Sequence, residues 1–180
     1  MISENDKASV FQSIPKEIAV GIETYDVYVD YASRCKVSEN LKDYPLVVTI
    51  RYFGDHRDEI ASPTNNLLRK EAAGANIRYV KGEIEQATLS INVHARDNHP
   101  DYLADTLLDA YIDALQIWLI RDLPKIVGVA GNTPVSDLSF LEESSRRRHM
   151  DVYIRYDQAY LETVTTIETV ETGDVQVTGS

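Results

Sequence analysis

The chain has 180 residues and a formal net charge of −11, and 43% of its residues are hydrophobic and 26% charged. This composition is ordinary for one globular domain and excludes wholesale disorder. The 18 Lys and Arg residues stand against 29 Asp and Glu residues. This excess of acidic residues excludes sequence-independent binding of nucleic acid, because such binding requires Lys and Arg to neutralise the phosphates. No apolar run approaches the roughly 20 residues that span a bilayer, and the single cysteine, Cys35, cannot form a disulfide within the chain.

Both ends of the sequence are polar, and we expect residues 1–12 and 172–180 to be flexible. The residues between them, 13–171, are predicted to form a single domain. Four segments of this domain alternate apolar and polar side chains with the period of two that marks half-buried strands: 22–31, 46–53, 87–95 and 150–156. A Thr-rich stretch at 161–170 has strand-forming composition as well.

Residues 54–76 are predicted to form a long loop with a short helical segment at 67–73. Loops of this length in compact domains are commonly functional. Immediately after it, residues 77–80 and the residues from 83 onward are expected to pair as a hairpin around the turn Lys81-Gly82.

One long helix is predicted from Pro100 to Leu123. The segment 98–101 supplies a capping residue, a first-turn proline and an acid near the positive end of the helix dipole. Apolar residues then recur at helical spacing as one stripe: Leu107, Leu108, Tyr111, Leu115, Trp118 and Leu119. Such a helix packed on one face of an antiparallel sheet forms a two-layer α+β sandwich, which is the expected fold class.

The sequence offers no motif for catalysis, for cofactor binding or for a metal site. It contains no GxSxG, GxGxxG or Walker-type loop. The four histidines lack the HExxH pattern, and no second cysteine supports zinc: His56, His94, His99 and His149. The charged run 55–59 is contiguous, so its side chains diverge, whereas catalytic groups must converge on one point. We therefore predict no enzyme, no cofactor and no metal.

Two charged groups are candidates for contacts between chains. Four aspartates repeat at every fourth residue along one side of the predicted helix: Asp101, Asp105, Asp109 and Asp113. Like charges at this spacing destabilise an isolated helix by roughly 0.2–0.5 kcal/mol per pair. Either this side is simply solvated, or it meets a basic patch on another chain. The only basic cluster in the sequence consists of Arg146, Arg147 and Arg148.

Tyrosine is used 11 times and phenylalanine three times, which favours a surface that contacts other proteins, because tyrosine is enriched at interfaces. Tyr28 and Tyr153 fall on the polar side of their predicted strands. These two tyrosines are therefore further interface candidates.

The order of elements is itself informative. A strand after Tyr44-Pro45 is followed by a long loop, a strand ending at Val93–Arg96, the long helix, a strand over Arg148–Tyr156 and a Thr/Glu-rich strand. Over roughly residues 41–170 this order resembles the tail-terminator (tail-completion) and neck proteins of tailed viruses.

The resemblance implies a non-enzymatic structural subunit of a hexameric ring that joins the tail tube to the head connector. The implied partners are copies of the chain and the neighbouring tail-tube and head-connector proteins, without a membrane. The implied location is the virion, after assembly in the host cytoplasm. DNA would pass through the ring without specific binding, and like-charge repulsion from an acidic protein keeps a passing duplex from sticking.

Two other classes of function remain open from the residues alone. One is an enzyme of unrecognised type, with a site built from the 54–76 loop and His94. The other is a ligand-binding α+β domain that dimerises through its sheet. The mass in solution separates these classes best, because neither alternative explains a six-fold ring.

Overall fold

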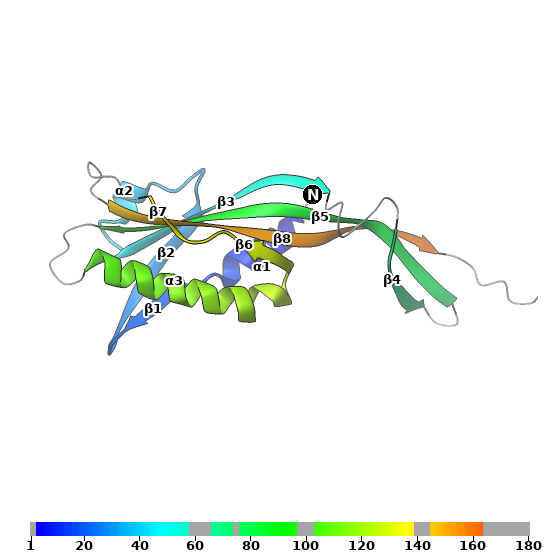
Figure 1. Ribbon diagram of the computed structural model, residues 1–180, viewed down its shortest axis with the longest axis horizontal. Coiled ribbons are helices and arrows are strands. Elements are labelled where there is room, and N and C mark those ends of the chain that lie inside the picture. The colour runs from blue at the N-terminus through cyan, green and yellow to red at the C-terminus, as the bar shows by residue number, and fades with distance from the viewer. Residues whose placement is uncertain (1–2, 58–65, 74–75, 97–102, 139–144, 164–180) are drawn as a thin grey trace, which may run out of the picture.

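The computed structural model describes residues 3–57, 66–73, 76–96, 103–138 and 145–163, and within them the side chains of 3–54, 84–96, 103–138 and 145–156. The fold is α+β, as predicted: a sheet of long strands carries one long helix on one face (Figure 1). The elements in chain order are α1 (Glu4–Ser13), β1 (Glu17–Val20), β2 (Glu23–Tyr31), α2 (Val37–Asn40), β3 (Leu46–Arg57), β4 (Asn66–Ala73), β5 (Asn76–Arg96), α3 (Ala104–Arg121), the 3-10 turn η1 (Leu123–Lys125), β6 (Gly128–Asn132), β7 (Ser136–Asp137) and β8 (Ser145–Thr163).

The sheet is mixed rather than wholly antiparallel. Its strand order is β1-β2-β3-β5-β8-β6, with β4 beside β5 and β7 beside β8. The central strands β3, β5 and β8 pair antiparallel, as predicted. The prediction of a plain antiparallel sheet is wrong at one ladder, because β2 and β3 run parallel. Residues 32–45, which include α2, form the crossover that a parallel pair requires in place of a tight hairpin.

Strands β5 and β8 form a ladder that continues far beyond the region under α3. The register runs from Arg96↔Ser145 to Arg78↔Thr163. At about 3.3 Å per residue, strands of 21 and 19 residues reach more than about 60 Å. On the other edge of β5, β3 pairs with residues 85–95 and β4 with residues 76–82. We call β4 together with residues 76–84 and 157–163 the arm, which extends away from α3 in Figure 1.

The arm corrects three predictions. Residues 67–73 belong to strand β4 and not to a helix, because their backbone pairs with β5 and this pairing overrides helix propensity. Strand β5 passes straight through Lys81-Gly82, where a turn was expected. The predicted loop at 54–76 is shorter than expected, since β3 continues to Arg57 and β4 begins at Asn66. The residues between, 58–65, lie outside the described part of the chain.

Helix α3 buries the predicted apolar stripe against the sheet. All six residues of the stripe are at most 7% exposed. They belong to one core with alternate residues of the three central strands, including Val48, Ile91 and Val152. The helix begins at Ala104 and its N-cap, Leu103, makes no side-chain hydrogen bond. The predicted cap at 98–101 lies outside the described residues. The helix ends at Arg121, slightly before the predicted Leu123.

Helix α1 occupies the segment that was expected to be flexible. Its Val10 is 0% exposed, and Ile14 just beyond it is 2% exposed, so both belong to the main core. The prediction of a flexible N-terminus at 1–12 is therefore wrong over the described residues, because burial of these two side chains holds α1 in place. The predicted flexible tail, 172–180, and the part of the Thr-rich stretch after Thr163 lie outside the described residues.

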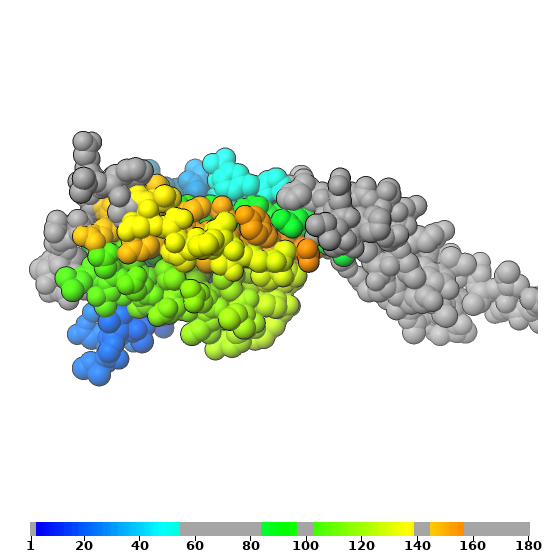
Figure 2. All heavy atoms as spheres, viewed as in Figure 1, coloured from blue at the N-terminus to red at the C-terminus, as the bar shows by residue number. Residues whose placement is uncertain are grey.

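In Figure 2, α3 forms an outer surface of the described part, next to the hairpin of β1 and β2. Within the described residues, no helix is both long and apolar enough to cross a bilayer.

Candidate assembly interface

Two aspartates of α3 and two arginines of β8 lie beside each other within one chain. Arg146 contacts the carboxylate of Asp105. Arg148 lies 3.3 Å from the carboxylate of Asp105 and 4.0 Å from that of Asp109. These two aspartates were expected to meet a basic patch on another chain. The structure instead supplies their basic partners from the same chain, because α3 packs along β8.

Arg148 is the centre of this ion-pair group. Its side chain is only 16% exposed, and it also contacts the carboxylate of Asp137 on β7. A charge buried to this extent must be paired, and removing one partner of such a group is costly. The group therefore fixes the beginning of α3 on the sheet, so its first role is structural.

Asp113, the last of the four regularly spaced aspartates, is exposed and lies outside the ion-pair group. Among the described residues it has no ion-pair partner, and Asp101 lies outside that part of the chain. Close to Asp113, Ile117 and Ile120 are 54% and 81% exposed. These two isoleucines were not among the interface candidates predicted from the sequence. The signal was present, because both fall outside the apolar stripe when the residues are placed on a helix.

Arg147 lies on the sheet face opposite α3, which we call the outer sheet face. In the β5–β8 register it is the partner of His94, which is 9% exposed. Burial, and secondly the positive charge of Arg147, lowers the pKa of His94 to about 4. The imidazole is therefore neutral at neutral pH, because its charged form is desolvated.

The alternative enzyme site combined His94 with the 54–76 loop. His94 pairs with Val47, whereas the strand β3 ends at Arg57. Ten residues of strand separate these two positions by about 33 Å. His94 and the point where the chain leaves β3 therefore do not form one site.

His149 lies on the outer sheet face with both ring nitrogens engaged. Its Nδ1 is 3.1 Å from the side-chain oxygen of Asn92, and its Nε2 is 3.3 Å from a carboxylate oxygen of Asp151. Within the described residues, no three His, Cys, Asp or Glu side chains are grouped so that they could hold a metal ion.

Tyr28 and Tyr153 both lie on the outer sheet face, as the alternation predicted. The Tyr28 ring lies 5.2 Å from the ring of Tyr44, and its hydroxyl lies 3.3 Å from the Asp30 carboxylate. Tyr153 is half-buried and faces Thr88 across the β5–β8 ladder. Their role in an interface stays a prediction.

The outer sheet face is covered at one end and open at the other. Val47 and Thr49 of β3 are 0% and 5% exposed. Further along the same strand, Phe53 is 44% exposed, and the guanidinium of Arg51 lies 4.5 Å from its ring centre. Arg51 is exposed and has no ion pair among the described residues. The sequence alone did not mark this pair, because nothing in it shows which end of the face is covered.

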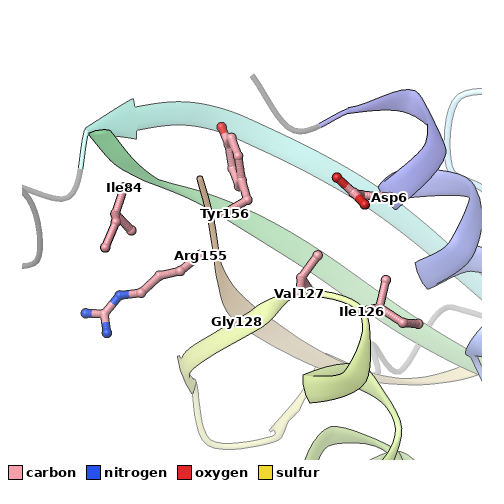
Figure 3. A pocket seen from close by; sticks show the side chains of 7 residues that line it. All are labelled: Asp6, Ile84, Ile126, Val127, Gly128, Arg155 and Tyr156. Carbon is pink, nitrogen blue, oxygen red and sulfur yellow. The ribbon is translucent and has the colours of Figure 1, made fainter. Parts of the chain in front are cut away.

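A hollow of about 410 Å³ lies where the arm leaves the domain (Figure 3). Its lining residues come from α1, β5, β8 and the segment around η1: Asp6, Ile84, Ile126, Val127, Gly128, Arg155 and Tyr156. In Figure 3 the side chains of Asp6 and Arg155 lie on opposite sides of the hollow. The Tyr156 hydroxyl donates a 2.8 Å hydrogen bond to Glu85. These groups do not converge on one point, as a catalytic site requires.

Comparisons with known proteins give no family for this chain: no protein-family model matches it, and no curated protein matches it significantly. Its function is therefore inferred from its surfaces and from the order of its elements.

Proposed function

We propose that the chain is a structural subunit of a tailed-virus particle, which assembles into a closed ring as a tail terminator or neck protein. The ring joins the tail tube to the head connector and lets DNA pass through its lumen. The subunit acts through contacts with its own copies and with these neighbours rather than as an enzyme. It works in the virion after assembly in the host cytoplasm.

The observation that carries this proposal is the arm. Among the described residues no helix lies over the arm (Figure 1), and a few strands are stable on their own only with a hydrophobic face or with another element packed on them. Such an extension gains stability when another chain covers it. The order of elements, which resembles that of tail-terminator and neck proteins, supports a ring as the form of the assembly.

The outer edge of the arm is suited to pairing with another chain. Strands β6 and β7 pair with β8 only within residues 148–155. Among the described residues, no strand lies along that edge of β8 at 157–163. The backbone N–H and C=O groups of an open edge are a template for adding a strand from a partner.

The charge of the chain agrees with a channel for DNA. With a formal net charge of −11, a ring of several copies has a strongly negative charge. A negative wall repels the phosphates of a duplex, so DNA slides past without being held. The mixed signs of Arg69, Lys70 and Glu71 in β4 suit the polar rim of a protein interface.

The mass of the purified chain in native mass spectrometry tests the proposal. We expect a multiple of the 20.3 kDa chain mass, and class-averaged micrographs that show a ring with six-fold symmetry. A protein that remains a single chain at its highest soluble concentration contradicts self-assembly. A two-fold dimer without rings instead favours the ligand-binding alternative.

A further inference from the structure

We infer that neighbouring copies dock through unlike faces, with the outside of α3 in one copy on the open part of the outer sheet face of the next. This inference rests on the proposed function, since it names the contact by which the chain assembles with itself. The helix face consists of Asp109, Asp113, Ile117 and Ile120. The sheet face consists of Arg51, Phe53, Thr88 and Tyr153.

The helix face combines exposed apolar side chains with unbalanced negative charge. Ile117 and Ile120 are neighbours at a spacing of three residues, and 54% and 81% of their surface is exposed. The outside of a surface helix is normally polar. Asp109 has only the 4.0 Å contact with Arg148, and 71% of its side chain is exposed. Asp113 has no ion pair in the described part of the chain.

The sheet face offers the opposite charge beside an aromatic ring. Helix α3 covers one face of the sheet, so the other face needs its own cover wherever it is apolar. Residues 47 and 49 are already buried, and the open part begins at Arg51. There, the Arg51 guanidinium lies over the exposed Phe53 ring, and Thr88 is the register partner of Phe53 on β5. The face therefore presents a cation and an apolar surface together.

The spacings of the two faces match. Asp113 and Ile117 are four residues apart on a helix, which separates them by about 6 Å along its axis. Arg51 and Phe53 are two residues apart on a strand, which separates them by about 6.6 Å. A helix lying along β3 of the next copy therefore brings Asp113 to Arg51 and Ile117 to Phe53 in one arrangement.

The contact must be head-to-tail. The two faces lie on opposite sides of the same chain, because α3 and the outer face are separated by the sheet. A two-fold dimer through the helix face would instead place Asp113 close to Asp113 of its partner, and like charges repel. A head-to-tail contact repeats from copy to copy and closes into a ring when the rotation permits.

A charge exchange tests the pairing. Asp113→Arg and Arg51→Glu should each weaken assembly at least about tenfold, because each places like charges together. The double variant carrying both changes should regain most of the wild-type assembly. The matched control is Asp26→Arg, which makes the same charge change at an exposed position of β2 and should leave assembly unchanged. The proposed contact is wrong if the single variants assemble normally. It is also wrong if the double variant assembles no more strongly than either single variant.

Cross-linking provides the second measurement. In a Cys35→Ser background, which removes the native thiol, Ile117→Cys and Phe53→Cys are placed on separate chains and mixed under oxidation. A disulfide requires Cα atoms closer than about 7 Å. We expect covalent dimers from the mixture, and a ladder up to the full ring from one chain that carries both cysteines.

The two proposals fail in different ways. A wild-type chain that stays single in solution overturns the proposed function, and this contact with it. A wild-type ring that shows neither charge rescue nor the disulfide overturns the contact alone.

Discussion

The indole nitrogen of Trp118 donates a 2.9 Å hydrogen bond to the hydroxyl of Ser13, at the end of α1. About two helical turns earlier, the Tyr111 hydroxyl donates at 2.9 Å to the carbonyl of Pro15. Both aromatic side chains are at most 1% exposed, and buried donors of this kind require acceptors. The N-terminal segment supplies both acceptors, so α1 and the residues after it belong to the core of the domain.

Trp118→Ala should reduce the free energy of unfolding by about 3–5 kcal/mol, because it leaves a large cavity under α3. Urea denaturation followed by circular dichroism measures this loss. Gln116→Ala is the control, since Gln116 is exposed on the same helix and is not part of the proposed docking face, and it should change stability by less than about 0.5 kcal/mol. Equal losses in both variants would contradict the assigned buried face.

Ser13→Ala should cost about 1–3 kcal/mol, because the buried indole N–H loses its acceptor. In a Trp118→Phe background no N–H remains to be satisfied, so the same change should cost much less. A double-mutant cycle by urea denaturation gives the coupling between the two side chains. Coupling near zero would show that this hydrogen bond does not hold α1 on the domain.

Arg148→Met should destabilise the fold by about 1–3 kcal/mol, because it removes the cation shared by three carboxylates, of which Asp105 keeps a second partner, Arg146. This loss is smaller than the roughly 3–5 kcal/mol for breaking a fully buried pair, since the side chains of Asp105 and Asp137 are 46% and 57% exposed. Asp26→Asn, at an exposed position of β2 outside the ion-pair group and the proposed docking faces, is the control and should leave unfolding unchanged. A loss that does not shrink in high salt would contradict the electrostatic cause.

The strands and the buried side of the helix could be predicted because their signal is local. Residues of the main core recur at every second position in β3, β5 and β8, although residues 47 and 49 of β3 are buried on the other face, and the buried residues of α3 follow helical spacing. Those periods are visible in the sequence without knowledge of any partner segment.

The features that were missed depend on segments distant in sequence. The residues of β4 are mostly good helix formers, yet β5 is available beside them for strand pairing. The parallel pairing of β2 with β3 follows from the crossover and not from either strand. In α1, only Val10 is buried, so its periodicity is too weak to mark a helix.

The candidate site shows the same difference between local features, which the sequence predicts, and long-range features, which it does not. Alternation placed Tyr28 and Tyr153 on the outer sheet face correctly, because that signal is local. The pairing of Asp105 with Arg148 joins residues that are 43 positions apart and exists only because α3 lies along β8. The exposure of Arg51 and Phe53, unlike the burial of residues 47 and 49 on the same strand, depends on tertiary packing, which no local pattern contains.

His94 should make the fold sensitive to acid. Its pKa falls from 6.5 to about 4 on folding, so the unfolded chain binds the proton more readily. The stability from the neutral imidazole is complete above pH 6.5 and is lost as the pH falls toward 4, by about 3 kcal/mol in all. His94→Gln should therefore lose less stability than the wild type between about pH 7 and about pH 4.5 in urea denaturation. Equal losses of stability in the wild type and in His94→Gln would contradict this prediction. A pKa near 6.5 for His94 in the folded protein, measured by NMR, would contradict it as well.

Removal of the arm should leave a folded chain that assembles less well than the wild type, because the docking faces of α3 and the sheet remain but the contacts of the arm are lost. Arg57 and Glu85 are register partners in the antiparallel β3–β5 ladder, so an Asn-Gly turn joining them can replace residues 58–84 with a tight hairpin. Ending this chain at Tyr156, the partner of Glu85 on β8, removes the rest of the arm.

All six residues of the α3 stripe and their partners on the sheet remain in this armless chain. Circular dichroism and cooperative urea unfolding should therefore stay close to those of the wild type, while native mass spectrometry shows a smaller share of the full assembly. The matched control ends at Thr163, which keeps the arm and removes only residues 164–180, and it should assemble normally. An armless chain that still forms the wild-type assembly would show that the arm is dispensable. A control that fails to assemble would assign the contact to the residues after Thr163 instead, since the arm itself is intact in that chain.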